Sequence, residues 1–292
     1  ITAVKNKRKE QDKLKKDFTP ALLDAGPLKI YLARHFGFCY GVENAIEIAF
    51  RAINDNPDKK IYLLSEMIHN PQVNTDLIER GVIFLQDAYG KQLISFDELD
   101  AGDIVMIPAF GTTLEIEKML HEKGIETKSY NTTCPFVEKV WNRSEQIAKK
   151  GYSIVIHGKP KHEETRATFS HASVSTPAVV VNDMQETVAL ADYITGKKPT
   201  ADFYKEFKGR YSKGFDVSMD LQRIGVVNQT TQLATDTQAI AEYLKNILQQ
   251  HYHLDDKNIG ERFADTRDTL CYATLDNQNA VTGMLQTPAD LA

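Results

Sequence analysis

Short apolar runs alternate with longer amphipathic stretches along most of the chain, from about residue 28 onward. The short runs have the length and β-branched content of buried strands, whereas the longer stretches repeat apolar residues at helical spacing. The predicted strands are Leu28–Ala33, Ile61–Leu64, Asp103–Ile107, Tyr152–Ile156, Val179–Val181 and Arg223–Val227. The predicted helices span residues 42–53, 74–80, 114–123, 137–150, 185–194, 236–249 and 276–285. Strands that alternate with helices in this way form parallel sheets, so the pattern predicts an α/β fold.

The same rhythm divides the chain into modules. We predict a polar, solvated N-terminal extension over residues 1–27 and a first α/β module over residues 28–131. A second module is predicted over residues 132–268, and the start of a third over residues 269–292. Within the second module, Gly196–Asp220 is polar, aromatic and rich in lysine, and we predict an inserted surface segment there. The third module ends at the entry to an expected strand, which predicts a module that is truncated in this chain.

Composition narrows the class of protein. The chain has 292 residues, of which 42% are hydrophobic and 26% are charged, as in ordinary globular proteins. Its formal net charge of -5 argues against nucleic acid as the main partner, and no apolar run has the length of a membrane helix. Three widely spaced cysteines do not form a disulfide framework, so we expect a reducing, cytoplasmic setting.

The three cysteines share one kind of position, next to the start of a predicted helix. Cys39 and Cys134 each precede a predicted helix, and Cys271 lies just before the last one. A helix N-terminus favours the thiolate, which is a ligand for iron or zinc. Their spacing alone matches no metal signature, so three unrelated buried cysteines remain the alternative at this point.

Polar side chains follow several predicted strands. His69 comes after the strand at 61–64, His162 and Glu164 after the strand at 152–156, and Thr230 after the strand at 223–227. In open α/β sheets, ligands bind beyond the carboxyl ends of the strands, so these loops are candidates for binding an anion and moving protons. Ordinary solvated loops are the alternative. The sequence contains no Walker P-loop, no strand-linked G-x-G-x-x-G and no G-x-S-x-G elbow, which disfavours nucleotide-dependent and simple hydrolase functions.

Six segments, in order, resemble motifs of the 4-hydroxy-3-methylbut-2-enyl diphosphate reductase family, also called the LytB family. They include all three cysteines and cover the chain from about Leu28 to its end. The segments are His35–Glu43, Glu66–Pro71, Thr133–Val140, Gly158 with His162–Glu164, Gln229–Thr231 and Leu270–Thr274.

The resemblance implies a trefoil of three α/β modules around a central [4Fe–4S] cluster held by Cys39, Cys134 and Cys271. It implies reductive dehydroxylation of (E)-4-hydroxy-3-methylbut-2-enyl diphosphate, an allylic diphosphate, to isopentenyl and dimethylallyl diphosphates. This oxidoreductase reaction is the last step of the non-mevalonate isoprenoid pathway, with ferredoxin or flavodoxin as the electron donor.

Residue roles follow from the matched motif positions. The resemblance implies that Glu164 is the proton source and that Thr230 binds the substrate hydroxyl. It implies that His69 and His162 bind the diphosphate, and that His162 also assists protonation.

The sequence departs from the common bacterial pattern at two places. Phe110, within Pro108–Gly111, stands where a further phosphate-binding histidine is expected, and this variation resembles the plant and cyanobacterial branch. The family's Gly-Gly-x-Asn-Ser-Ser-Asn segment is expected after Ala292, so the fragment is expected to be inactive or impaired. Two other functions stay open from the residues: a structural or regulatory metal-binding α/β protein, and a non-metal anion-binding α/β protein.

Overall fold

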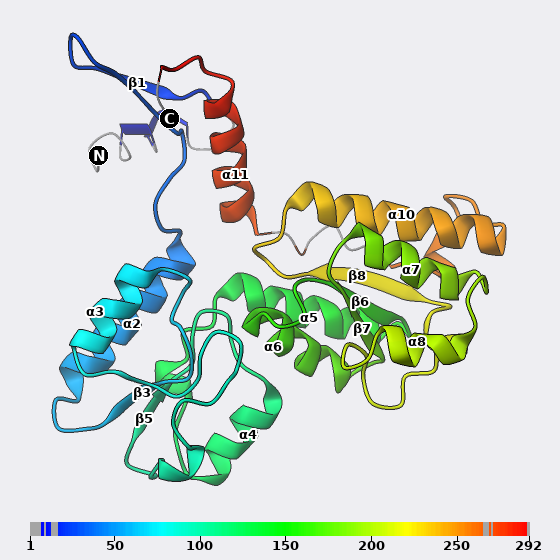
Figure 1. The fold of residues 1–292 in the computed structure, drawn as a ribbon, viewed down its shortest axis with the longest axis horizontal. Helices are drawn as coiled ribbons and strands as arrows, with labels where there is room; N and C mark the ends of the chain where they lie inside the picture. The colour runs from blue at the N-terminus through cyan, green and yellow to red at the C-terminus, as the bar shows by residue number, and fades with distance from the viewer. Residues whose placement is uncertain (1–6, 9, 13–16, 265–268, 270, 291–292) are drawn as a thin grey trace. The chain divides into compact units, whose positions relative to one another are not determined.

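The structure is a computed structural model that describes residues 7–8, 10–12, 17–264, 269 and 271–290. The chain forms two compact units (Figure 1). One unit combines the two ends of the chain, Ile1–Cys39 and Leu270–Ala292, and the other is continuous, Tyr40–Thr269. Within the described residues, every helix is too short or too polar to cross a bilayer.

The first half of the continuous unit is built on a three-stranded parallel sheet. Its strand order is β4-β3-β5, where β3 is Ile61–Leu63, β4 is Ile83–Phe84 and β5 is Ile104–Met106. The helices that accompany this sheet are α2 (Tyr40–Asp55), α3 (Pro71–Glu79) and α4 (Leu114–Glu122).

Successive strand residues point to opposite faces of this sheet and enter two different cores. Ile61, Leu63 and Met106 pack with buried alanines of α2 and with Leu77 of α3. The alternate residues, beginning with Tyr62, pack with Leu120 of α4. Because both faces are covered, the strands are apolar throughout, as parallel sheets require.

The second half of the continuous unit has a second parallel sheet, of order β7-β6-β8. Its strands are β6 (Ser153–His157), β7 (Ala178–Val181) and β8 (Ile224–Asn228). The associated helices are α5 (Pro135–Ala148), α6 (Glu163–Ser173), α7 (Met184–Ile194), α8 (Thr200–Glu206), α9 (Val217–Asp220) and α10 (Ala234–Tyr252). Helices α5 and α6 cover one face of this sheet, and α7 and α10 cover the other (Figure 1).

Most residues of the predicted surface segment Gly196–Asp220 are exposed, but the segment is anchored by buried aromatic side chains. Its phenylalanines Phe203, Phe207 and Phe215 are almost completely buried in the core between the second sheet and the helices α7 and α10. Phe203 stacks on both of the others, at ring-centroid distances of 4.9 and 5.3 Å. The polar residues between them occupy the outer face, so the segment lies on the surface and is held there by its aromatic side chains.

The unit formed by the two chain ends contains an antiparallel hairpin and one helix. The hairpin pairs β1 (Ala21–Asp24) with β2 (Lys29–Leu32). The predicted strand at residues 28–33 therefore exists, but it pairs with a strand of the predicted extension rather than joining the parallel sheet. The helix is α11 (Tyr272–Leu285), which begins four residues before its predicted start. Residues 287–290 form no strand, although a strand was predicted to begin there.

The described part of the extension is folded rather than merely solvated. Arg8 is buried, and its guanidinium donates to the carbonyl oxygens of Ala33 and Arg34, at 2.7 and 3.2 Å. Arg34 in turn forms an ion pair with Asp17 at 3.1 Å. The rest of the first 16 residues and the last two residues of the chain lie outside the described residues, and the three-module division stays a prediction.

Candidate functional site

The loop after β3 holds His69 through the backbone on either side of it. Asn74 of α3 is buried; its side-chain oxygen accepts the N–H of Met67 at 3.2 Å, and its side-chain nitrogen donates to the carbonyl of Ile68 at 3.0 Å. Asn70 then caps α3, with proline at the first helical position. The residue before the cap, His69, is thus fixed at the carboxyl end of the first sheet, with its side chain 41% exposed.

The loop after β5 brings Phe110 against His69. The two rings are stacked, with centroids 4.4 Å apart and planes 26° apart. The next residue, Gly111, has φ +75°, and a Cβ there would lie 2.5 Å from the indole ring of Trp141. Only glycine suits both that dihedral angle and that close approach, so the turn after Phe110 depends on it.

His162 caps α6 and contacts His69 directly. Its Nδ1 accepts the backbone N–H of Glu164 at 3.1 Å, and its Nε2 lies 2.8 Å from Nε2 of His69. Burial, followed by the nearby positive charges of His69, Lys159 and Arg166, lowers the pKa of His162 to about 4. His162 is therefore a neutral imidazole at physiological pH.

Glu164 is a fully buried carboxyl next to Thr230. The backbone N–H of Thr230 donates to Oε1 of Glu164 at 2.5 Å. The other carboxyl oxygen of Glu164, Oε2, has no hydrogen-bond partner among the described residues. Burial raises the pKa of Glu164 to about 7, although hydrogen bonds from Thr230 oppose the shift. A carboxyl in this state holds a proton near neutrality and can release it, which is the property of a general acid.

Gln229 joins the loops after β6 and β8. Its side-chain oxygen accepts the N–H of Lys159 at 3.1 Å and the hydroxyl of Thr165 at 3.0 Å. Gly158 leaves the room for this arrangement, because a Cβ there would lie 2.5 Å from the Thr165 hydroxyl and 3.0 Å from Cβ of Gln229. The loops that carry His162 and Thr230 are thus tied to each other.

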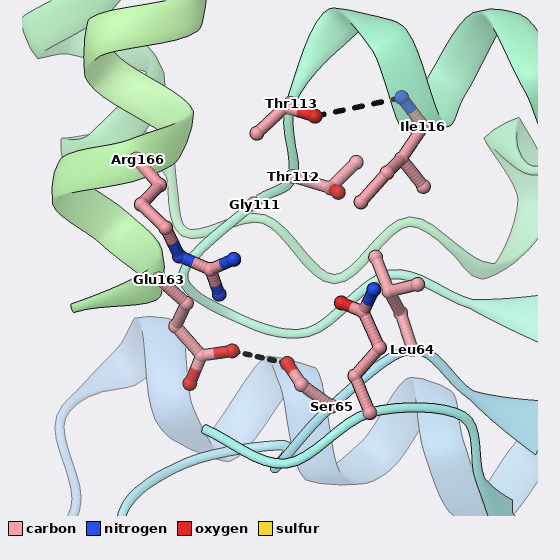
Figure 2. Close-up of a pocket in the computed structure, with 9 residues that line it drawn as sticks. Leu64, Ser65, Gly111, Thr112, Thr113, Ile116, Glu163 and Arg166 are labelled. Atoms are coloured by element: carbon pink, nitrogen blue, oxygen red, sulfur yellow. Dashed lines mark hydrogen bonds between the residues drawn. The ribbon is translucent and has the colours of Figure 1, made fainter. Parts of the chain in front are cut away.

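A second buried carboxyl, Glu163, was given no role by the sequence. Ser65 donates a hydrogen bond to Oε2 of Glu163, and Figure 2 shows the two side chains pointing towards each other at a small cavity that Arg166 also lines. Burial is the largest cause that raises the pKa of Glu163 to about 8. Its Oε1 lies 3.9 Å from Nε2 of His69. Residue type offered no signal, because a glutamate in the first turn of a helix is usually exposed.

Each of the three cysteines lies at the start of a helix, as was predicted. Cys39 immediately precedes α2, and Cys134 and Cys271 are the N-cap residues of α5 and α11. All three are thiols rather than disulfides. Cys134 lies beside the loop of Phe110, because its N–H donates to the carbonyl of Ala109 at 2.9 Å. No group of three or more metal-binding side chains is found within the described residues.

The structure brings four predicted site residues into one connected group. His69 contacts His162, the latter caps the turn that carries Glu164, and Glu164 contacts Thr230. Cys134 lies in the same unit as this group, whereas Cys39 and Cys271 belong to the other unit. His157 lies outside this group: it is the last residue of β6 and is buried, with Nδ1 2.8 Å from the hydroxyl of Thr237.

The paired imidazoles and the buried acid thus lie at the carboxyl ends of parallel strands, which is where ligands bind in α/β proteins. A family model described as LytB protein matches residues 30–292, and the chain belongs to this family. The family prediction and the predicted α/β fold with parallel sheets are therefore confirmed.

Two relatives illustrate the similarity. A protein of Synechococcus sp. (strain RCC307), named 4-hydroxy-3-methylbut-2-enyl diphosphate reductase, is 40% identical over 269 residues, which is 92% of this chain and 64% of that protein. A Prochlorococcus marinus (strain NATL1A) protein of the same name is 38% identical over 270 residues, covering 92% and 65%. The chain thus spans slightly less than two thirds of these relatives. Both are cyanobacterial, in agreement with the predicted branch.

Solved structures agree on the fold. The structure titled (E)-4-hydroxy-3-methyl-but-2-enyl diphosphate reductase, the terminal enzyme of the non-mevalonate pathway, superimposes with a TM-score of 0.58 at 24% identity, covering 86% of this chain and 71% of that one. The Plasmodium falciparum E-1-hydroxy-2-methyl-but-2-enyl-4-diphosphate reductase superimposes with a TM-score of 0.59 at 21% identity, covering 87% and 72%.

Proposed function

We propose that this chain is the greater part of a 4-hydroxy-3-methylbut-2-enyl diphosphate reductase. The reaction replaces the allylic hydroxyl of the substrate by hydrogen, with two electrons and two protons, and releases water. The products are isopentenyl and dimethylallyl diphosphates. Family membership, together with the names of the relatives, supports this proposal. The observation that carries it is the buried Glu164 carboxyl held at the backbone of Thr230.

Glu164 suits the acid step of this reaction. Loss of the hydroxyl oxygen as water needs a proton donor close to that oxygen, and hydroxide is a poor leaving group. Because burial raises the pKa of Glu164 to about 7, much of this carboxyl is protonated near neutral pH and can donate its proton to the leaving oxygen. Thr230 lies beside this carboxyl, and we propose that its hydroxyl hydrogen-bonds the substrate hydroxyl and passes the proton on.

The cysteines suit an iron–sulfur cluster by their chemistry. Each thiol lies at the N-terminal end of a helix, where the helix dipole favours the thiolate. We propose that Cys39, Cys134 and Cys271 hold a [4Fe–4S] cluster, which supplies the two electrons one at a time and a Lewis-acidic iron. Ferredoxin or flavodoxin would deliver these electrons, and the thiols suit a reducing compartment such as the cytoplasm.

The two histidines suit the diphosphate. His69 and His162 meet at the ends of β3 and β6, at the N-terminus of α6, where backbone N–H groups favour an anion. We propose that both imidazoles bind the diphosphate while Glu164 and Thr230 act at the other end of the substrate. The substrate is elongated, with a diphosphate at one end and a hydroxyl at the other, which matches a site with the two histidines on one side and Glu164 and Thr230 on the other.

Anaerobic reconstitution tests the proposal. We expect about four iron and four sulfide per chain, and turnover of the allylic diphosphate with a reduced electron donor, in this chain or in one extended to the length of the relatives. Glu164→Gln should keep the iron and lose turnover, whereas Glu122→Gln, on the exposed side of α4, should keep both. An extended chain that holds its iron and does not reduce the substrate contradicts the proposal.

A further inference from the structure

Trp141, the single tryptophan of the chain, lies on α5 and covers the turn that follows Phe110. A Cβ at Gly111 would lie 2.5 and 2.6 Å from the indole carbons Cη2 and Cζ2, so the outer edge of the six-membered ring rests on the Gly111 backbone. Because interiors are close-packed, a displacement of the turn towards the indole would produce a clash.

Helix α6 holds the indole in this position. The Nε1–H of Trp141 donates to the hydroxyl of Thr168 at 3.1 Å. The ring of His171 is stacked on the indole, with centroids 3.7 Å apart and planes 10° apart. The hydrogen bond, the stack and the edge contact with Gly111 together fix both rotatable bonds of the side chain. Trp141 is therefore a fixed support for the turn.

Helix α5 contacts the same turn at a second point. The N–H of Cys134 donates to the carbonyl of Ala109 at 2.9 Å. Cys134 and Trp141 lie two helical turns apart on α5, which is roughly 10 Å along the helix axis. The hydrogen bond limits movement of the turn away from α5, and the indole limits movement towards it. Residues 108–111 are thus held at one place on α5.

Phe110 lies between these two contacts. Its ring is stacked on His69, with centroids 4.4 Å apart, and meets the ring of His162 edge to face, with centroids 5.3 Å apart. The contacts that hold residues 108–111 on α5 therefore also fix Phe110 and the rings against it relative to Cys134. One short turn connects the two imidazoles with the start of α5.

We propose that Trp141 is a positioning residue of the reductase, which, by holding Gly111, sets the distance between Phe110 at the diphosphate end of the site and Cys134 at the cluster. This inference rests on the proposed function, because it takes the substrate to reach from the histidines to the cluster. A substrate that is bound by its head group and reacts at its other end is sensitive to this distance. A displacement of about 1 Å can lower the rate about 10²-fold.

Amide hydrogen exchange of the full chain labelled with ¹⁵N-cysteine tests the support of the turn. The three cysteines give three backbone signals, and a Cys134→Ser variant assigns the relevant one. The Cys134 N–H precedes α5 and donates to Ala109, so its exchange reports on the contact between helix and turn. Trp141→Leu should speed this exchange at least about tenfold. The N–H groups of Cys39 and Cys271, in the other unit, should stay within about twofold.

Two further variants separate positioning from stability. Trp141→Phe keeps an aromatic ring beside His171 but lacks the carbons that cover Gly111, so it should speed the exchange nearly as much as Trp141→Leu. Phe215→Leu loosens the aromatic core beside α7 and α10, and should lower the melting temperature while leaving the Cys134 exchange within about twofold. Equal acceleration in Phe215→Leu, or wild-type exchange in Trp141→Phe, overturns the proposal.

Steady-state kinetics of the iron-loaded reductase test the functional consequence. Trp141→Phe should lower kcat about ten- to hundredfold and raise KM less than about threefold, because the two histidines still bind the head group. Phe215→Leu should change both by less than about twofold. A Trp141→Phe variant with wild-type kcat overturns this inference and leaves the reductase proposal standing. A wild-type chain that holds its iron and reduces nothing contradicts the reductase proposal, whereas the exchange rates still decide whether Trp141 holds the turn.

Discussion

The carboxyl ends of the two parallel sheets are built very differently. At the first sheet, His69 is 41% exposed and is held by a ring stack and a half-exposed carboxylate. At the second sheet, Glu164 is fully buried, and the loops around it are cross-linked by the Gln229 side chain. The first end is open to solvent, whereas the second is closed and holds its carboxyl in a dry environment.

The proposed reaction requires two things of the site: binding the diphosphate head group and delivering a proton to the leaving oxygen. Under the proposed function, the open end binds the charged head group, and the closed end delivers a proton, which benefits from a fixed, desolvated acid. Each sheet contributes one task under this proposal, and His162, which follows β6 and contacts His69 after β3, connects the two. Changes at the closed end should therefore affect chemistry and stability strongly, and the effects should weaken towards the open end.

The largest expected effect is on Glu164. Glu164→Gln keeps the shape of the side chain and the acceptor for the Thr230 N–H, but removes the transferable proton. We expect kcat of the reconstituted reductase to fall by about 10²- to 10⁴-fold with little change in melting temperature. Steady-state kinetics and thermal melts measure the two quantities. Wild-type turnover by this variant would remove Glu164 from the reaction.

The next effect concerns the tight loop junction. Gly158→Ala places a methyl group 2.5 Å from the Thr165 hydroxyl and 3.0 Å from Cβ of Gln229. We expect a loss of about 1–3 kcal/mol in the free energy of unfolding, measured by urea titration. Gly260→Ala is the matched control, since nothing lies within 4 Å of its Cβ position. Similar losses in both variants would show that the junction is not tightly packed.

Glu163 should make stability depend on pH. Its folded-state pKa of about 8 lies above its unfolded value, so the folded protein binds the extra proton. Stability is then greatest below about pH 4.5 for this group and is lost as pH rises through 8. The stability of Glu163→Gln relative to wild type should therefore be greater at pH 8.5 than at pH 5, by roughly 3–4 kcal/mol. Urea unfolding at the two pH values decides this, and an equal difference at both contradicts it.

A smaller effect appears in the pH profile of turnover. Because the pKa of Glu164 is about 7, its protonated fraction falls as pH rises through neutrality. We expect kcat/KM to decline about tenfold per pH unit above pH 7, and to level off below it. Rates at pH 6, 7, 8 and 9 with a saturating electron donor measure the slope. A rate that stays constant to pH 9 is the contrary result.

Much of the architecture follows from the apolar periodicity. The strands of both sheets were predicted within a few residues, because both faces of a parallel sheet are buried and the strands are uniformly apolar. The two-residue strand β4 was missed, since Ile83–Phe84 is too short for a pattern. The hairpin β1–β2 was missed for another reason: its first strand lies in a segment whose overall composition is polar.

Helix α6 shows where reasoning from sequence fails in the site itself. Apolar periodicity does not predict a helix over Glu163–Ser173, which is rich in polar residues, yet Glu163, Glu164 and Thr165 are all buried in its first turn. Their partners, Ser65 and Gln229, come from distant parts of the chain. Glu164 and Thr230 were found through motif resemblance, whereas Glu163 and its partner Ser65 became visible only through contacts.

The unit that combines both chain ends bears on how the protein is made. The β1–β2 hairpin leaves the ribosome early, but α11, which lies in the same unit, is about 240 residues further along the chain. At ordinary translation speeds this gap lasts roughly 10 to 50 s. During that time Leu22, Leu28 and Ile30 of the hairpin region, already exposed in the finished structure, wait without their later neighbour. Tyr40–Thr269 can fold meanwhile, so the unit that contains the β1–β2 hairpin is completed only after the continuous unit has been synthesised.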